Sequence, residues 1–142
     1  MGQLGNSGGQ KFWSWYGFES RVEWCACFAS WCAEQSGMVA SGQVLKFSSC
    51  AVGASWFQGQ GRWKGKGYTP SAGDFIFFDW NKDGQVDHVG IVVNVANGRV
   101  NTIEGNTSNM VARRSYQLGG IVIVGYLSLI HISEPTRLGM IS

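Results

Sequence analysis

The stretch Trp24–Gly37, Trp-Cys-Ala-Cys-Phe-Ala-Ser-Trp-Cys-Ala-Glu-Gln-Ser-Gly, decides the fold of this chain. Nearly all of its first ten positions are apolar or small, whichever face of a helix is drawn. A helix that is apolar all round is a buried helix. Gly37 is a suitable stop, and Ser20 with Glu23 forms a Ser-x-x-Glu capping box ahead of the stretch. The pattern therefore predicts a buried helix of about four turns.

Cys25 falls near the N-terminal end of this helix. Free backbone N–H groups and the helix dipole favour an anion there, so a cysteine can have its pKa lowered and become a thiolate nucleophile. The alternative is a small core residue like Cys27 and Cys32, since free cysteine is often simply buried. The helix alone favours that alternative.

Two segments in the second half of the chain favour the nucleophile instead. Val86–Val95 is rich in β-branched residues and carries His88, and Arg99–Asn106 reads as a second strand that carries Glu104 and Asn106. A helix-start cysteine with a strand histidine and a strand acid or amide is the layout of a cysteine hydrolase. The thiolate attacks a carbonyl, the histidine moves the proton, and the third group orients the imidazole.

The loop between these two strands decides which side chains meet. A two-residue turn at Asn97-Gly98 would put His88 on the sheet face away from Glu104 and Asn106. A three-residue loop that includes Ala96 puts His88 opposite Asn106, with Glu104 diagonal to it. We predict the three-residue loop because it brings the catalytic side chains onto one face.

Four motifs, in this order, resemble the CHAP domain, whose name stands for cysteine, histidine-dependent amidohydrolase/peptidase. They are Trp24-Cys25-Ala26-x-Phe28-x-Ser30-Trp31, Pro70-x-x-Gly73-Asp74-Phe75-Ile76-Phe77-Phe78, Asp87-His88-Val89-Gly90-Ile91-Val92 and Glu104-Gly105-Asn106. The resemblance covers roughly residues 5–126. Members of this family resemble papain in their core and mostly cut peptidoglycan.

The resemblance implies an α+β, papain-like fold with N-terminal helices packed on an antiparallel β-sheet. It implies that Cys25 is the nucleophile, His88 the base, and Glu104 and Asn106 the orienting groups. The implied reaction is hydrolysis of a peptidoglycan amide bond through a thioester, by an N-acetylmuramoyl-L-alanine amidase or a peptide endopeptidase. The implied location is extracellular or in the cell wall. The alternatives are an inactive wall-binding module, or a cysteine peptidase or transamidase that acts on a non-wall peptide.

Length and composition limit the class of protein. The 142 residues fit one domain with a sizeable core. A charged fraction of 14% and a net charge of +2 argue against a nucleic-acid partner and against disorder. Residues 1–10 have neither the charged nor the apolar part of a signal peptide, and no transmembrane run follows. We expect a monomer without membrane insertion.

Phe12–Phe18 places five aromatic residues within seven positions. Aromatic side chains there either cover the first helix or line the groove beside the nucleophile, where their faces suit sugar rings. The groove candidates are Trp13, Trp15 and Trp24. Further along the chain, the sequence predicts a helix over Ala51–Phe57, a central strand over Asp74–Asp79 and a last buried strand over Gly119–Tyr126.

The loop before His88 matches the first part of a calcium-binding loop, Asp-x-Asn-x-Asp-Gly. Its candidate ligands are Asp79, Asn81, Asp83, the backbone carbonyl of Gln85, and Asp87. The twelfth position is Gly90 and not the bidentate glutamate, and strands flank the loop where helices would be expected. The alternative is an Asx-type turn between strands. No cofactor is required for the proposed chemistry, and calcium is the one candidate.

The four cysteines leave their pairing open. If Cys25 is catalytic, three remain and at least one of them must be a free thiol. A Cys27–Cys50 pair, a Cys32–Cys50 pair and the fully reduced state are all compatible with the sequence.

The last residues do not continue any pattern of the domain. Ser128–Arg137 resembles translated sequencing-adapter read-through, so we assign residues 1–128 to the CHAP-like domain and residues 129–142 to a non-native tail. A genuine C-terminal extension is the alternative. On the first view, ending the chain after Ser128 leaves stability and activity unchanged.

Overall fold

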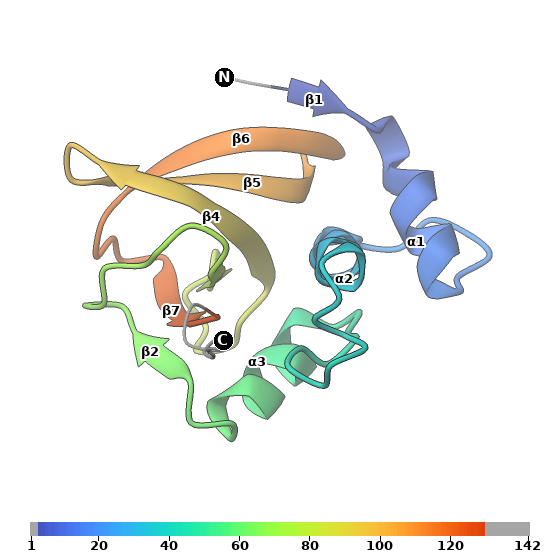
Figure 1. Ribbon diagram of the computed structural model, residues 1–142. Coiled ribbons are helices and arrows are strands. Elements are labelled where there is room, and N and C mark those ends of the chain that lie inside the picture. Colours follow the sequence, from blue (N-terminus) through green and yellow to red (C-terminus); the bar gives the residue numbers. More distant parts are fainter. Residues whose placement is uncertain (1–2, 130–142) are drawn as a thin grey trace.

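The computed structural model describes residues 3–129. Within them, a curved antiparallel sheet of seven strands has the order β1-β6-β5-β4-β3-β7-β2, with the helices on one side (Figure 1). The strands are β1 (Gln3–Gly5), β2 (Trp63–Gly65), β3 (Phe75–Phe78), β4 (His88–Ala96), β5 (Arg99–Thr107), β6 (Met110–Gln117) and β7 (Ile123–Leu127). The helices are the 3-10 turn η1 (Ser7–Gly9) and α1 (Gln10–Tyr16), α2 (Cys25–Gln35) and α3 (Cys50–Gln58). The predicted α+β class is confirmed.

Helix α2 is the buried helix that the sequence predicts. It packs against β4 and β5 on one side and α1 on the other. It begins at Cys25, and no side chain caps its N-terminus, so the predicted Ser20–Glu23 capping box is wrong. Gly37 follows the helix with a φ of 79°, the left-handed conformation expected at a glycine stop.

The aromatic segment around α1 covers α2. Phe12 stacks on Trp24 at 5.7 Å between ring centroids and meets Phe28 and Trp31 edge-on at 5.1 and 5.3 Å. Edge-to-face contacts at such distances suit the charge distribution of aromatic rings. Phe12 therefore covers the helix, which is one of the two roles predicted for this segment.

Helix α3 is held beside α2 by a buried hydroxyl. Ser30 of α2 donates to the carbonyl of Phe47 at 2.7 Å and accepts the Phe47 N–H at 2.9 Å. Ser49 then caps α3 by accepting the N–H of Val52. These bonds fix the start of α3, at Cys50, close to the start of α2.

The β4–β5 turn differs from the prediction. Asn97 and Gly98 both have positive φ, 56° and 75°, and form a two-residue turn that pairs Ala96 with Arg99. Asn-Gly is the favoured sequence for such a turn because both positions tolerate positive φ. The predicted three-residue loop is therefore wrong.

A β-bulge nevertheless restores the register that the three-residue loop would have given. Val93 is an extra residue in β4, and beyond it Ile91 pairs with Ile103. Continued to the end of β4, this register brings His88 onto the same sheet face as Glu104. The one-residue shift that the site needs comes from the strand and not from the turn.

Strand β3 is central, between β4 and β7, as predicted. Both of its faces are buried. One face packs on α2 and α3, and the other lies within the curve of the sheet with Val92, Val100 and Tyr126. Strand β6 and the short strands β1 and β2 were not among the predicted elements.

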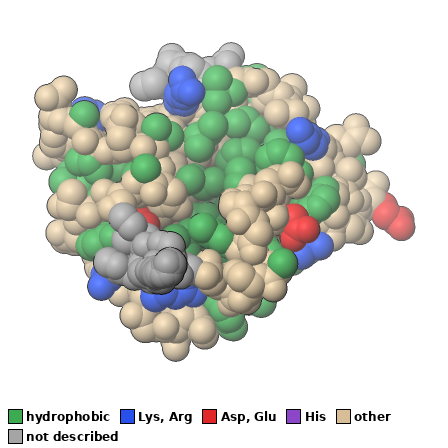
Figure 2. Space-filling view, in the orientation of Figure 1, with side chains coloured by type: hydrophobic (Ala, Val, Ile, Leu, Met, Phe, Trp, Pro, Cys, Tyr) green, Lys and Arg blue, Asp and Glu red, His purple; other side chains and the backbone are tan. Residues whose placement is uncertain are grey.

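The described surface adds two observations. On the face drawn in Figure 2, Lys and Arg side chains are scattered and not gathered into a patch. Within residues 3–129, no helix has both the length and the apolar character needed to cross a bilayer. The absence of a nucleic-acid partner and the monomeric state stay predictions.

Leu129 belongs to the core although it was assigned to the tail. Its side chain is 6% exposed, and its N–H donates to a buried Asp74 carboxylate oxygen at 3.0 Å. The N–H of Ser128 donates to the carbonyl of Arg62. Residues 130–142 lie outside the described part of the chain, so their non-native origin stays a prediction.

These contacts reverse the expected result of ending the chain after Ser128. Such a chain should lose about 2–4 kcal/mol of unfolding free energy, because a buried leucine is removed and Asp74 loses a donor. Urea unfolding measures the difference. The control is a chain that ends after Leu129, which should match the full chain; equal stability of the two truncated chains would contradict this assignment.

Candidate active site

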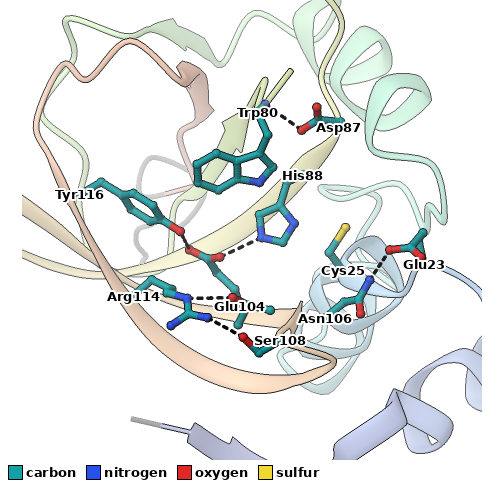
Figure 3. Close-up of a pocket in the computed structure, with 11 residues that line it drawn as sticks. Glu23, Cys25, Trp80, Asp87, His88, Glu104, Asn106, Ser108, Arg114 and Tyr116 are labelled. Carbon is teal, nitrogen blue, oxygen red and sulfur yellow. Dashed lines mark hydrogen bonds and ion pairs between the residues drawn. The ribbon is translucent and has the colours of Figure 1, made fainter. Parts of the chain in front are cut away.

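Cys25 is the first residue of α2 and opens into a cavity of about 410 Å³. The helix start leaves its first backbone N–H groups without intrahelical partners. Residues from α2, β4, β5, β6 and three connecting segments line the cavity: Glu23, Cys25, Trp80, Asp87, His88, Glu104, Asn106, Thr107, Ser108, Arg114 and Tyr116. Figure 3 shows His88 between Glu104 and Cys25.

His88 and Glu104 form a buried pair. The Nε2 atom of His88 lies 2.8 Å from Oε1 of Glu104, and the glutamate is 1% exposed. Gly90 makes room for it, since a Cβ at this position would lie 2.7 Å from Cγ of Glu104. The carboxylate thus fixes one ring nitrogen of His88 and leaves the other for the reaction.

Glu104 is itself held by two hydroxyl groups. Tyr116 donates to its Oε2 atom at 2.7 Å, and Thr102 donates to the same atom. Burial, followed by the negative charge of Glu104, raises the pKa of Tyr116, so this phenol stays a donor. Tyr116 was missed from the sequence because it lies on β6, a strand without a clear alternating pattern.

The charges of Cys25 and His88 support one another. The pKa of Cys25 is lowered chiefly by a hydrogen bond from Cys50, and then, against the effect of burial, by the bond and charge of His88. For His88, burial disfavours the cation, but bonds to Cys25 and Glu104 outweigh it and raise the pKa to about 10. The arrangement favours a thiolate–imidazolium pair at neutral pH.

All four cysteines are free thiols in the structure, which is the reduced alternative of the sequence analysis. The Sγ atom of Cys50 lies 3.3 Å from that of Cys25. Burial raises the pKa of both Cys27 and Cys32 to about 11, so these two are poor nucleophiles.

The structure shows no hydrogen bond between Asn106 and His88, the contact that the predicted orienting role needs. The Asn106 amide donates to the Glu23 carboxylate and its oxygen accepts from Arg21 at 2.8 Å. The reason is local backbone geometry. Asn106 has a φ of 60° at an irregularity between Glu104 and Thr107, which breaks the strand alternation. Of the two predicted orienting groups, the one bonded to His88 is Glu104.

None of the three predicted groove tryptophans lines the cavity. Trp24 is completely buried in the core, the indole N–H of Trp13 donates to the carbonyl of Gly8, and Trp15 contacts the Lys46 ammonium group at 4.5 Å. The structure therefore corrects this prediction, because Trp24 is used in the core and Trp13 and Trp15 make contacts away from the cavity.

Trp80 is the tryptophan that lines the cavity. It is 42% exposed, its ring stacks on Phe78 at 4.9 Å, and it lies 5.9 Å from the His88 ring. In the sequence, Trp80 falls within the candidate calcium loop, where the oxygen ligands and not the indole were predicted to be functional.

The carboxylates of that loop accept backbone N–H groups. Asp79 accepts from Gly84 at 2.7 Å and from Asp83 at 3.2 Å. Desolvation acts to raise the pKa of Asp79, but these backbone hydrogen bonds together outweigh it and lower the pKa. Asp87 accepts from Trp80 and Asn81, and Asp83 accepts from Gln85. Among residues 3–129, no group of three or more Asp, Glu, His or Cys side chains is placed to hold a metal. Oxygens used in this way fit the Asx-type turn; calcium binding stays a prediction and no catalytic step uses it.

Comparisons with known proteins agree with this geometry. The family model of the CHAP domain matches residues 15–106. A crystal structure of Ly7917 resembles the chain with a TM-score of 0.52 and 21% identity, over 73% of this chain and 52% of that one. A crystal structure of Ly7917 with the hydrolyzing product of MDP gives a TM-score of 0.52 and 22% identity over the same shares.

The chain spans about half the length of those two structures, and identities at this level show a shared fold. No curated protein sequence matches the chain. The family model, in contrast, covers well over half of the chain and includes every predicted catalytic position. On that ground, this protein belongs to the CHAP domain family.

Proposed function

We propose that the protein hydrolyses an amide bond of bacterial peptidoglycan by acyl transfer through Cys25. The observation that carries the proposal is the order of groups in one cavity. A thiol at a helix start lies next to a histidine, and that histidine is bound on its far side by a buried carboxylate. This order is what nucleophilic catalysis by a thiolate requires.

The proposed reaction proceeds in two halves. The Cys25 thiolate attacks the carbonyl carbon, and backbone N–H groups at the start of α2 stabilise the negative charge that develops on the oxygen. His88 gives its proton to the leaving amine as the C–N bond breaks, which leaves a thioester. Water then attacks the thioester while His88 removes its proton, and the carboxylic acid and the Cys25 thiolate are released.

Three observations support peptidoglycan as the substrate. The chain belongs to a family whose members mostly cut this polymer. A similar structure, Ly7917, was solved with the hydrolyzing product of MDP. Finally, the cavity combines an exposed indole, Trp80, with an arginine, a pairing that suits a sugar ring next to an acidic peptide. The protein would act outside the cell or in the cell wall.

Arg114 is the arginine of this cavity. Its Nε atom donates to the Thr107 hydroxyl at 2.7 Å and its Nη2 atom to the Ser108 hydroxyl at 3.2 Å. It makes no ion pair with any residue between 3 and 129, so its charge is not neutralised by a carboxylate there. A stem peptide of peptidoglycan carries carboxylates that would fill this role.

Replacing Arg114 by glutamine should raise KM for a carboxylate-bearing stem peptide about 10- to 100-fold and change kcat little. A hydrogen bond to a charged group contributes about 1.5–3 kcal/mol. The measurement compares stem peptides that differ only in a carboxylate or a carboxamide. The variant should lose the preference for the carboxylate, whereas Arg113→Gln, at an exposed position, should keep it. An unchanged preference in Arg114→Gln would contradict the role.

A turbidity assay on purified cell walls, followed by mass spectrometry of the fragments, tests the proposed function. An amidase separates the lactyl group of muramic acid from L-alanine, whereas an endopeptidase leaves that bond and exposes new termini within the peptides. Walls that bind the protein without clearing would favour the inactive binding module. Cleavage of free peptides alone would favour a peptidase with a non-wall substrate.

A further inference from the structure

The nucleophile of the proposed reaction has a second sulfur beside it. The Sγ atoms of Cys25 and Cys50 are 3.3 Å apart, and both side chains are buried. Each cysteine is the first residue of a helix, α2 and α3. The two bonds between Ser30 and Phe47 tie the segment before α3 to α2 and hold the sulfur atoms together. In the acyl-transfer mechanism this second thiol donates a hydrogen bond to the Cys25 thiolate, but no bond to its sulfur forms or breaks.

The two sulfur atoms differ in charge and in access. Cys25 lines the cavity, but Cys50 does not. The pKa of Cys50 is raised well above its usual value, first because it donates a hydrogen bond to Cys25 and then because it is buried. A small oxidant that enters the cavity therefore reacts first with the Cys25 thiolate, while Cys50 remains a protonated thiol.

We propose that Cys50 is a resolving thiol, which forms a reversible disulfide with Cys25 when a peroxide oxidises the active site. The inhibitory effect of this disulfide rests on the proposed role of Cys25, but the bond itself does not. In the first step the thiolate attacks one peroxide oxygen; an S–O bond forms, the O–O bond breaks, and hydroxide leaves. Cys25 becomes a sulfenic acid.

In the second step the Cys50 sulfur attacks the Cys25 sulfur. The S–S bond forms, the S–O bond breaks, and the Cys50 proton leaves with the hydroxyl group as water. Overall, one thiolate and one thiol lose two electrons, and hydrogen peroxide is reduced to one water and one hydroxide, which takes a proton from solvent to become the second water. The first step replaces the Cys25 thiolate that accepts the hydrogen bond from Cys50, which is the largest cause of the raised pKa of Cys50, and it also removes the negative charge of Cys25. The second thiol therefore becomes easier to deprotonate.

The geometry suits this bond more than any other pairing. A disulfide needs its sulfur atoms about 2.05 Å apart, so the pair must approach by about 1.2 Å. Cys27 lies two residues from Cys25 along α2 and packs with Phe12 and Trp24 on another side of the helix. Without a resolving thiol, a sulfenic acid goes on to sulfinic acid, which a thiol reductant does not reverse. Cys50 would protect the nucleophile as well as block it.

The test treats the reduced full chain with hydrogen peroxide, blocks remaining thiols with N-ethylmaleimide after denaturation, and maps the digest by mass spectrometry. We expect a cross-linked peptide pair containing Cys25 and Cys50. Wall lysis should be lost and should return with dithiothreitol. In Cys50→Ser, which keeps a hydrogen-bond donor, the loss should not be reversed and Cys25 should gain two oxygen atoms. Cys27→Ser and Cys32→Ser are the matched controls and should recover as the wild type does.

The mass measurement separates this inference from the proposed function. A chain that forms the Cys25–Cys50 cross-link but never lyses walls would overturn the function and keep the disulfide. A chain that lyses walls but gives no such cross-link, or links Cys25 to Cys27, would overturn the disulfide alone. Full recovery of Cys50→Ser by dithiothreitol would also overturn it, because some other route would then protect Cys25.

Discussion

Cys25→Ala should abolish amide hydrolysis, with kcat/KM lower by on the order of 10³–10⁶. Loss of one member of a catalytic unit removes nearly the whole contribution of that unit. His88→Ala should have an effect of similar size, because the thiolate would lose the imidazolium beside it and the leaving amine its proton donor. Wall turbidity and release of fragments measure the rates, and circular dichroism in the near ultraviolet checks the fold.

The buried Cys27 and the partly buried Cys32 provide the controls. Cys27→Ala and Cys32→Ala should keep activity, because neither side chain lines the cavity. At pH 6, iodoacetamide should label Cys25 first, since the pKa of Cys27 and of Cys32 is about 11. Lysis of walls by Cys25→Ala at the wild-type rate would remove Cys25 from the mechanism.

The sequence was sufficient to predict the central helix and the three principal side chains of the site. The apolar run after Trp24 predicts a buried helix, and Cys25 is its first residue, although the capping box expected ahead of it is absent. His88 and Glu104 stand on β-branched segments whose strand character is strong. Local preference and tertiary structure agree at these positions, so the secondary structure of each could be predicted from the residues next to it in the sequence.

The register between those strands was readable only in part. The Asn97-Gly98 turn follows its local preference, and the bulge at Val93 compensates for it. A β-branched residue in a β-branched run carries no local sign of a bulge. The predicted sheet face of His88 is therefore correct, but the predicted cause, a three-residue loop, is wrong. The bulge becomes evident only from the pairing of Ile91 with Ile103.

Other parts of the site depend on contacts that no local pattern contains. Cys50 reaches Cys25 because Ser30 binds the backbone of Phe47, a contact across 17 positions. Tyr116 and Arg114 come from β6, which lacks clear alternation. The same limit explains why the predicted groove tryptophans were wrong. Composition indicates that aromatic rings are present, but tertiary packing determines which ring lines the cavity.

Glu104→Gln should lower kcat/KM at neutral pH by about 10²–10⁴ and move the alkaline limit of activity to lower pH. The effect of a misplaced or uncharged orienting group on a catalytic histidine is of this size. In the wild type the raised pKa of His88 keeps the proton on the ring up to about pH 10. An amide in place of the carboxylate removes the negative charge that helps to hold this proton. The pKa of His88 then falls, the leaving amine loses its proton donor at a lower pH, and the descending limb of the pH–rate profile shifts downward.

Asn106→Ala and Tyr116→Phe are the matched variants for that profile. Asn106 binds Glu23 and Arg21, so its removal should leave the alkaline limit near pH 10 whatever it does to substrate binding. Tyr116→Phe removes one donor to Glu104 but keeps the negative charge, so its alkaline limit should also stay close to that of the wild type. A shift of the limit in Asn106→Ala, together with an unmoved limit in Glu104→Gln, would assign the orienting role to Asn106. Of these variants, only Glu104→Gln removes a negative charge next to His88. The pH of the alkaline limb therefore reports which group holds the imidazole during catalysis.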